Sequence, residues 1–251
     1  MKSLASLLCA VLLAVGSLTA QTSRSYDFAD FTGVSVNAGI YASIEYGTDF
    51  SIEITGDSDD LDDLEVEVKD NTLMLSMKSS SSWWNWMKRL DKVEAVVTMP
   101  RLDRLTANGG ADVRSKHRWE SGDFVAKSNG GADLVFSVKA KNLDATSNGG
   151  ADLTADIEVD YLEASSNGGA DLDLSGTAIK ASLRANGGAD LTAPKLMCER
   201  VDASANGGAD IVVSVSKAIN ASANGGADIL YYGDPAEKNV SSNGGGDVTR
   251  G

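Results

Sequence analysis

The pentapeptide Asn-Gly-Gly-Ala-Asp constrains the fold of this chain more than any other feature of its sequence. It occurs seven times, and a variant with glycine in place of alanine ends the series. Successive asparagines are 21, 19, 19, 19, 20, 18 and 19 residues apart. A fixed period of this kind indicates structural units that stack on copies of themselves, so the second half of the chain is predicted to be a solenoid. The motifs begin at Asn108, Asn129, Asn148, Asn167, Asn186, Asn206, Asn224 and Asn243.

The residues between two motifs alternate between apolar and polar side chains. In the unit that begins at Asn148, alternate positions from Leu153 to Val159 are apolar, and a second alternating run begins at Leu162. This period of two is typical of strands. Two short strands and about 19 residues per unit fit one coil of a β-helix, because a propeller blade needs four strands and about 40 residues. We predict an all-β, right-handed parallel β-helix, with the hand taken from the preference of parallel crossovers.

The motif itself has the composition of a tight turn. Two adjacent glycines adopt positive φ at little steric cost, and asparagine tolerates the left-handed region better than most residues. The next residue is alanine in seven motifs, Ala151 for example, and Gly246 in the last. This restriction predicts an inward position without room for a larger side chain.

Residues 1–20 resemble a secretory signal peptide. Lys2 supplies a basic start, an apolar run extends from Leu4 to Leu18, and Ala20 is a small residue before the expected cleavage site. No later run approaches the 18 or more apolar residues of a membrane span. We therefore expect an exported protein without a transmembrane segment, located in the periplasm, on the outer cell surface or outside the cell.

Residues 21–100 are rich in predicted strands but do not repeat. Asp70-Asn71 separates two alternating runs and is a two-residue hairpin signal. We expect this N-terminal β region to continue into the repeat β-helix of residues 101–251 and to cap it, because an open end would present unpaired strand edges. A Trp-rich insertion at residues 79–92 interrupts the strand pattern.

Charge and composition exclude several kinds of partner and site. The chain has 22 basic and 36 acidic residues and a formal charge of −14; loss of Lys2 with the signal peptide leaves 21 basic residues and a charge of −15. Nucleic acid, anionic lipid and polyanionic glycans would be repelled. Cys198 is the only cysteine of the mature chain and His117 the only histidine. An intrachain disulfide and a multi-histidine zinc site are therefore excluded.

Besides the Gly-Gly-Ala-Asp corners, the chain contains four further motifs: Tyr26-Asp27-Phe28, Phe31-Thr32-Gly33-Val34, the run from Glu65 to Leu73 and the run from Val96 to Leu102. In these motifs the sequence, from about Tyr26 to the end, resembles the auto-transporter adhesin head domain family (head GIN domain), a family of exported bacterial proteins. The family has Ser-Gly-Ser-Gly-Asp-like corners, so the corners here are a variant that keeps the aspartate. The resemblance implies a β-helix-like fold and, through the family name, adhesion; it implies no catalytic residues.

The first candidate site is the column of corner aspartates. If the coils stack in register, carboxylates recur about every 4.8 Å and neighbours repel each other by roughly 1 kcal/mol in water. In a structural interpretation, corner amides and the asparagine of the next coil donate hydrogen bonds to each carboxylate. The alternative is a calcium-stabilised, β-roll-like binding protein, with calcium as the one cofactor considered. The column consists of Asp112, Asp133, Asp152, Asp171, Asp190, Asp210, Asp228 and Asp247.

The second candidate site is the Trp-rich insertion, with Trp83, Trp84 and Trp86 as candidate binding residues. Trp83, Trp86 and Leu90 would share one face of a short helix. This face either seals part of the β-helix or forms an exposed aromatic patch for a glycan, a partner subunit or a membrane interface. The sequence leaves both interpretations open.

These observations favour an exported, non-enzymatic β-helix scaffold, adhesin-like, at the cell surface or in the periplasm. A glycan or a protein is the expected partner, and a homo-oligomer is left open. The alternative from another class is a polysaccharide-acting β-helix enzyme. Acid/base catalysis needs two carboxyl groups with separated pKa values, and eight near-equivalent aspartates do not provide such a pair. We therefore predict no catalytic residues.

Overall fold

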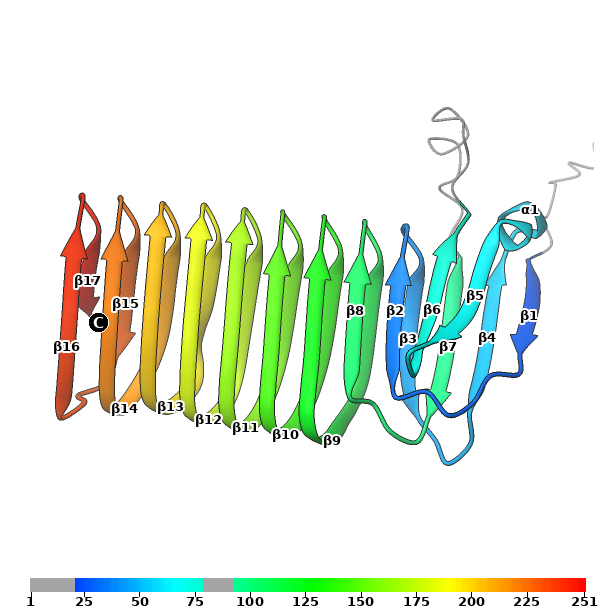
Figure 1. Cartoon of the computed structure of the whole chain (residues 1–251), viewed down its shortest axis with the longest axis horizontal. Helices are drawn as coiled ribbons and strands as arrows, with labels where there is room; N and C mark the ends of the chain where they lie inside the picture. Colours follow the sequence, from blue (N-terminus) through cyan, green and yellow to red (C-terminus); the bar gives the residue numbers. More distant parts are fainter. Residues whose placement is uncertain (1–20, 79–92) are drawn as a thin grey trace, which may run out of the picture.

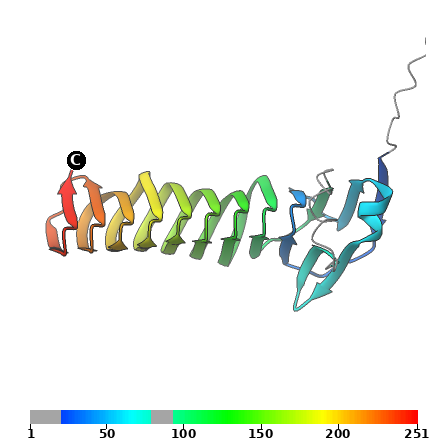
Figure 2. The ribbon, with the colours of Figure 1, turned by 90° about the horizontal axis from the view of Figure 1, so that it is seen from above.

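The computed structural model describes residues 21–78 and 93–251, and the chain is almost entirely β-structure within them. Seventeen strands and one short helix, α1 (Ser58–Asp62), are present in this part of the chain. The repeats form a solenoid whose coils stack along one axis, with the N-terminal strands at one end (Figures 1 and 2). The predicted β-helix of about 19 residues per coil is confirmed.

Each solenoid coil is one long strand that bends in the middle. The first half of the strand lies in the back sheet of Figure 1, the second half rises in the front sheet, and a glycine corner at the top leads to the next coil. The coil is right-handed, as predicted. We expected two separate strands per coil, but the backbone ladder continues around the lower bend. These strands are β9 (Asp112–Asn129), β10 (Asp133–Asn148), β11 (Asp152–Gly168), β12 (Asp171–Gly187), β13 (Asp190–Gly207) and β14 (Asp210–Asn224).

Neighbouring coils are parallel and in register. Asp133 lies opposite Asp152, Leu134 opposite Leu153, and Asn148 opposite Asn167. Residues that alternate along each strand therefore form columns that are either buried or exposed along the whole solenoid. The corner alanines are at most 1% exposed, which confirms that they point inward.

The last coil consists of separate short strands, β15 (Asp228–Tyr232), β16 (Glu237–Asn243) and β17 (Asp247–Arg250). Lys238 and Arg250 are in register with the inward residues Ile219 and Tyr231 of the preceding strands. Both cations contact Asp234, at 2.9 Å and 3.1 Å. Charged residues thus replace apolar ones where the solenoid meets solvent.

The N-terminal strands extend both sheets, but their spatial order differs from their sequence order. In the front sheet β2 lies between β6 and β8, and in the back sheet β3 lies between β7 and β9. Antiparallel pairs, β5–β6 in front and β4–β7 and β1–β4 behind, complete this end. The strands are β1 (Thr22–Tyr26), β2 (Gly33–Asn37), β3 (Tyr41–Tyr46), β4 (Ser51–Gly56), β5 (Leu64–Lys69), β6 (Thr72–Met77), β7 (Glu94–Met99) and β8 (Arg104–Asn108).

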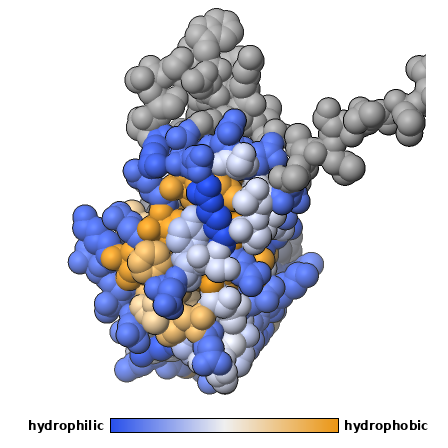
Figure 3. All heavy atoms as spheres, turned by 90° about the vertical axis from the view of Figure 1, so that its right-hand side faces the viewer, coloured by the Kyte–Doolittle hydropathy of each residue, from blue (hydrophilic) through white to orange (hydrophobic). Residues whose placement is uncertain are grey.

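The predicted hairpin at Asp70-Asn71 joins β5 and β6, and both residues have positive φ, 48° and 57°. The N-terminal strands share one hydrophobic core with the solenoid. Viewed from this end, some apolar surface remains exposed among hydrophilic side chains (Figure 3). Tyr26, Val66 and Val68, on β1 and β5, are half-buried hydrophobic residues of these terminal strands.

Candidate functional site

A continuous column of asparagine side chains stabilises the corner edge of the solenoid. The amide nitrogen of each corner asparagine donates to the amide oxygen of the asparagine in the preceding coil, for example from Asn148 to Asn129 at 2.8 Å and from Asn167 to Asn148 at 2.9 Å. Such bonds join every corner from Asn108 to Asn243. Half-buried amides that form these bonds leave little unsatisfied polarity at the corners.

The asparagine column contains a ninth residue, Asn37, which the sequence analysis missed. Asn108 donates to Asn37 at 2.8 Å, and Asn37 in turn donates to the carbonyl of Leu75 at 3.2 Å. Asn37 is followed by Ala38 and Gly39, which both have positive φ, 61° and 72°. The sequence signal for this further corner was Asn37-Ala38-Gly39, which forms a turn like the Asn-Gly-Gly corners. Tyr41 then takes the place of the corner aspartate, because it is in register with Asp112.

The eight candidate aspartates form one column beside the asparagines, half-buried at Asp112 and exposed from Asp133 onward, with their backbone held by the preceding coil. The amide of Asp152 donates to the carbonyl of Ala132 at 2.9 Å, and the equivalent bond recurs at each later coil. Desolvation at the column, followed by the charges of Asp133 and Asp171, raises the pKa of Asp152. The pKa of Asp190 is raised by desolvation and by Asp210 and Asp171.

The hydrogen bonds that we expected to satisfy these carboxylates are made elsewhere. The asparagine amides bind each other, and the corner amides bind backbone carbonyls, as in the bond from Gly130 to Asn148 at 2.9 Å. Asp112 is neutralised by Arg114, which donates to its two oxygens at 2.8 Å and 3.1 Å. At the last corner, the amide of Asp247 donates to the carboxylate of Asp228 at 3.2 Å. Few hydrogen-bond donors or cations therefore contact the carboxylates of this column.

The corner aspartates are the candidate ligands for calcium. A bound calcium ion takes six to eight oxygen ligands from several directions. In residues 21–78 and 93–251, no group of three or more His, Cys, Asp or Glu side chains is arranged to hold a metal ion. The aspartates face solvent in a single row, and the corner on their other side presents asparagines.

The sole histidine lies at the junction between the N-terminal strands and the solenoid. The longer first spacer forms a bulge in β9, where the register shifts between Val135 and Ser137 of the partner strand. The bulge places His117 on Tyr46 at the end of β3, with ring centroids 4.6 Å apart and planes at 17°. Trp119 lies beneath, 2% exposed, and donates to Ser115 at 2.8 Å. His117 and Tyr46 therefore form an exposed aromatic contact at this junction.

A shallow groove crosses the lower part of the front sheet, and the sequence analysis did not predict it. Its volume is about 380 Å³, and its lining comes from β9, β10, β11 and β12. Tyr161, 54% exposed, lies within the groove between Asn142 and Lys180 of the adjacent coils. An exposed aromatic residue at an outward strand position was the available signal. A search for residues that repeat from coil to coil does not detect this single tyrosine.

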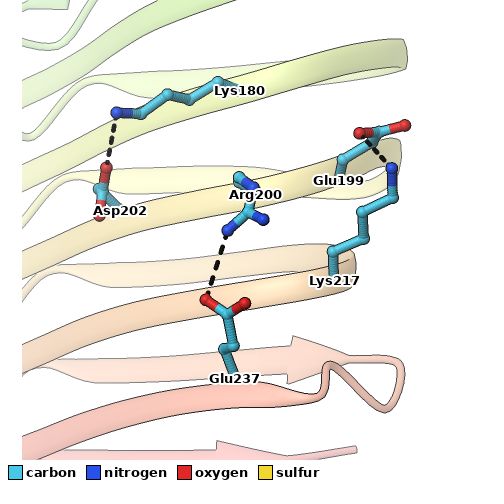
Figure 4. Close-up of polar contacts among 6 residues, drawn as sticks. All are labelled: Lys180, Glu199, Arg200, Asp202, Lys217 and Glu237. Atoms are coloured by element: carbon cyan, nitrogen blue, oxygen red, sulfur yellow. Dashed lines mark hydrogen bonds and ion pairs between the residues drawn. The ribbon is translucent and has the colours of Figure 1, made fainter.

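Ion pairs between coils hold the charged side chains at the C-terminal end of this groove and on the coils that follow it. Lys180 contacts Asp202 of the next coil at 3.4 Å, and Arg200 contacts Glu237 at 3.4 Å (Figure 4). Around the bend, Lys217 contacts Glu199 at 2.7 Å. Exposed pairs of this kind contribute little stability each, but they fix the positions of long side chains.

Trp83, Trp84 and Trp86 lie outside the described residues. The described residues on either side, Lys78 and Val93, follow β6 and precede β7. These two strands form a coil in register with β2 and β3.

One family of known proteins matches most of this chain. The family described as "Putative auto-transporter adhesin, head GIN domain" matches residues 30–235. No curated protein matches the sequence.

Within the described part of the chain, no helix has the length and apolarity needed to cross a bilayer.

Solved structures from Parabacteroides and Bacteroides species have the same fold. A "putative lipid binding protein" from Parabacteroides distasonis and a "putative adhesin" from Parabacteroides merdae each align with a TM-score of 0.79, 18% identity, and coverage of 92% of this chain and 96% of theirs. A "putative adhesin" from Bacteroides fragilis aligns with a TM-score of 0.68, 22% identity, and coverage of 92% and 97%. At these identities the likeness establishes the fold. With the family match over most of its length, this chain belongs to the auto-transporter adhesin head GIN domain family.

Proposed function

We propose that this protein is an exported, non-enzymatic binding scaffold of the bacterial cell envelope. The observation that carries the proposal is the register of the solenoid, which arranges outward side chains in straight columns along two long sheets. Such a surface presents many equivalent positions to an extended ligand. The family name and the adhesin descriptions of similar structures support a surface role.

A binding role also agrees with the chemistry of the exposed carboxylates. Environment shifts the pKa values of Asp152 and Asp190 in the same direction, upward. An acid/base pair for glycoside hydrolysis needs two carboxyl groups that differ in pKa and lie on either side of one bond. A row of similar carboxylates on one face is better suited to contact with a ligand than to its cleavage.

The calcium-stabilised alternative makes a different prediction about the corner aspartates. A bound ion would stabilise the folded state in proportion to the logarithm of its concentration. Because the described aspartates form a single row without a cage, we propose that the solenoid is stable without calcium. Thermal unfolding of residues 21–251 in excess calcium and in chelator tests this, with magnesium as control. A melting temperature that rises with calcium would favour the alternative.

Export and envelope binding can be tested separately. Cells that produce the full chain with a C-terminal tag should process it near Ala20 and place it outside the cytoplasm, whereas a variant that starts at Gln21 should remain inside. Purified residues 21–251 should sediment with isolated cell envelopes. Treatment of the envelopes with periodate or with protease then separates a glycan ligand from a protein ligand. Retention of the full chain in the cytoplasm, or no sedimentation, would contradict the proposal.

A further inference from the structure

We propose that the groove at Tyr161 is a binding site for a neutral saccharide chain that lies along the solenoid axis. The proposal rests on the envelope-binding function above and names the ligand class and the site. The groove extends over four successive coils, from Asp123 through Asn142 and Tyr161 to Lys180, which are in register in one outward column. The coil spacing of about 4.8 Å is close to the length of one sugar ring, so a linear glycan can present successive rings to successive coils.

The aromatic ring supplies the apolar part of the site. The ring of Tyr161 is 54% exposed and lies in a column whose residues in the two adjacent coils are polar. Beneath it, the groove contacts Leu143, Leu162 and Phe124, which belong to the hydrophobic core. Binding sites for small molecules combine such apolar surface with a few polar groups that fix orientation. The C–H face of a pyranose ring packs on an aromatic ring in this way, while the phenol hydroxyl remains available for a hydrogen bond.

The polar groups around the ring are held in place before a ligand arrives. Asn142 donates to Asp123 at 2.6 Å, and Thr146 donates to Asp144 at 3.2 Å. Glu163 pairs with Arg184 of the next coil. The remaining carboxylate lone pairs can accept hydrogen bonds from sugar hydroxyls, and such charge-assisted bonds are stronger than neutral ones. Side chains fixed in this way lose less conformational entropy on binding.

The charged side chains that line the groove favour neutral over anionic glycans. Three carboxylates, Asp123, Asp144 and Glu163, line it together with one cation, Lys180, which is itself paired with Asp202 (Figure 4). An anionic polysaccharide would meet this excess of negative charge and the net charge of the whole chain. Neutral sugars, which offer hydroxyl donors to carboxylates, match the site.

The position of the groove argues against a peptide or a lipid as the ligand. Extended peptides bind sheets through unpaired backbone groups at an edge. The groove lies on the face of the sheet, where the ladders on both sides of β10 and β11 are formed. A lipid chain requires an enclosed apolar cavity, whereas this groove is shallow and open to solvent.

The test uses purified residues 21–251 and the neutral oligosaccharides cellohexaose, chitohexaose and maltohexaose, with binding measured by calorimetry. At least one should bind, Tyr161→Ala should weaken that binding by tenfold or more, and Tyr161→Phe should retain most of it. Tyr232→Ala is the matched control, because Tyr232 is 39% exposed on β15, outside the groove. Equal melting temperatures would show that the variants fold alike.

Several outcomes would overturn the proposal. These are absence of binding by all three neutral oligosaccharides, equal affinity of Tyr161→Ala and the unsubstituted chain, or an equal loss in Tyr232→Ala. Preference for an anionic oligosaccharide such as hexagalacturonate would also contradict it. If the unsubstituted chain and Tyr161→Ala sediment equally with envelopes, the groove assignment fails while the envelope-binding function stands. If oligosaccharides bind at Tyr161 but envelopes do not, the envelope function fails instead.

Discussion

The imidazole of His117 stacks on the phenol ring of Tyr46, with ring centroids 4.6 Å apart. Tyr46 ends β3 of the N-terminal strands, whereas His117 belongs to the bulge of the first full solenoid coil. The contact therefore joins the two parts of the fold beyond the end of their backbone ladder, which extends from Tyr41 opposite Asp112 to Ile44 opposite Ser115.

This contact predicts coupling between the two side chains. Tyr46→Ala and His117→Ala should each lower the free energy of unfolding, and the double variant should lose less than the sum. The coupling should be about 0.5–1.5 kcal/mol, the range for stacked aromatic pairs. Urea denaturation of the four proteins measures it. Strictly additive losses would show that the rings stack without mutual stabilisation.

The asparagine column predicts a position-dependent cost of substitution. Asn148 donates to Asn129 and accepts from Asn167, so Asn148→Ala leaves one half-buried acceptor and one half-buried donor without partners. We expect a loss of about 1–3 kcal/mol in unfolding free energy. Asn243→Ala is the control, because Asn243 is exposed and only donates, at 3.3 Å. Equal losses at both sites would contradict a role for the interior hydrogen bonds.

Two adjacent glycines in one corner should differ in their tolerance of substitution. Gly168 has a φ of 90°, and a β-carbon there would lie 3.3 Å from the backbone of Gly149, whereas Gly169 has no positive φ and open space around it. We predict that Gly168→Ala costs about 1–3 kcal/mol. Gly169→Ala should change stability by about 0.5 kcal/mol or less. Unfolding midpoints in urea test both, and a reversed order would mean that the corner can change its backbone conformation.

Repulsion in the aspartate column predicts a stabilising substitution. Desolvation and neighbouring carboxylates raise the pKa of Asp152, so the folded state favours the protonated form. Stability from that preference is present below the unfolded pKa and is lost as pH rises through the raised folded pKa. Asp152→Asn should therefore stabilise the protein at pH 7, by a few tenths to about 1 kcal/mol for an exposed site, and should give no gain in acid.

Asp112→Asn provides the comparison for this prediction. Asp112 occupies the same column but accepts two hydrogen bonds from Arg114, so its replacement should give no gain at pH 7. Thermal unfolding as a function of pH, repeated in 1 M salt to screen the charges, measures both variants. A destabilised Asp152→Asn would show that this carboxylate has a stabilising partner.

Cys198 should be chemically inert in the folded protein. The thiol is 2% exposed, and burial raises its pKa to about 12. The thiolate is the reactive form. Residues 21–251 should therefore resist iodoacetamide at pH 8 and react once unfolded in urea, as measured by mass spectrometry. Rapid reaction in native buffer would indicate local opening of β13.

The solenoid could be predicted from the sequence because its interactions repeat at short range. Each Asn-Gly-Gly-Ala-Asp corner shows its turn chemistry and its small inward residue locally, and equal spacing places equal residues opposite each other. The corner at Asn37 could not be found in this way. Its coil lies between β6–β7 on one side and β8–β9 on the other, although β6 and β7 come later in the chain.

The sequence by itself determined the coil, its period and the inward and outward faces, because these depend on residues within one repeat and its copies. Only the tertiary structure decided which side chains act together. The asparagines bind each other and leave the aspartates exposed, His117 meets Tyr46, and Tyr161 lies in a groove formed by four coils. These relationships depend on how coils bend and bulge when they stack, and distances between side chains on different coils are not encoded in the repeat period.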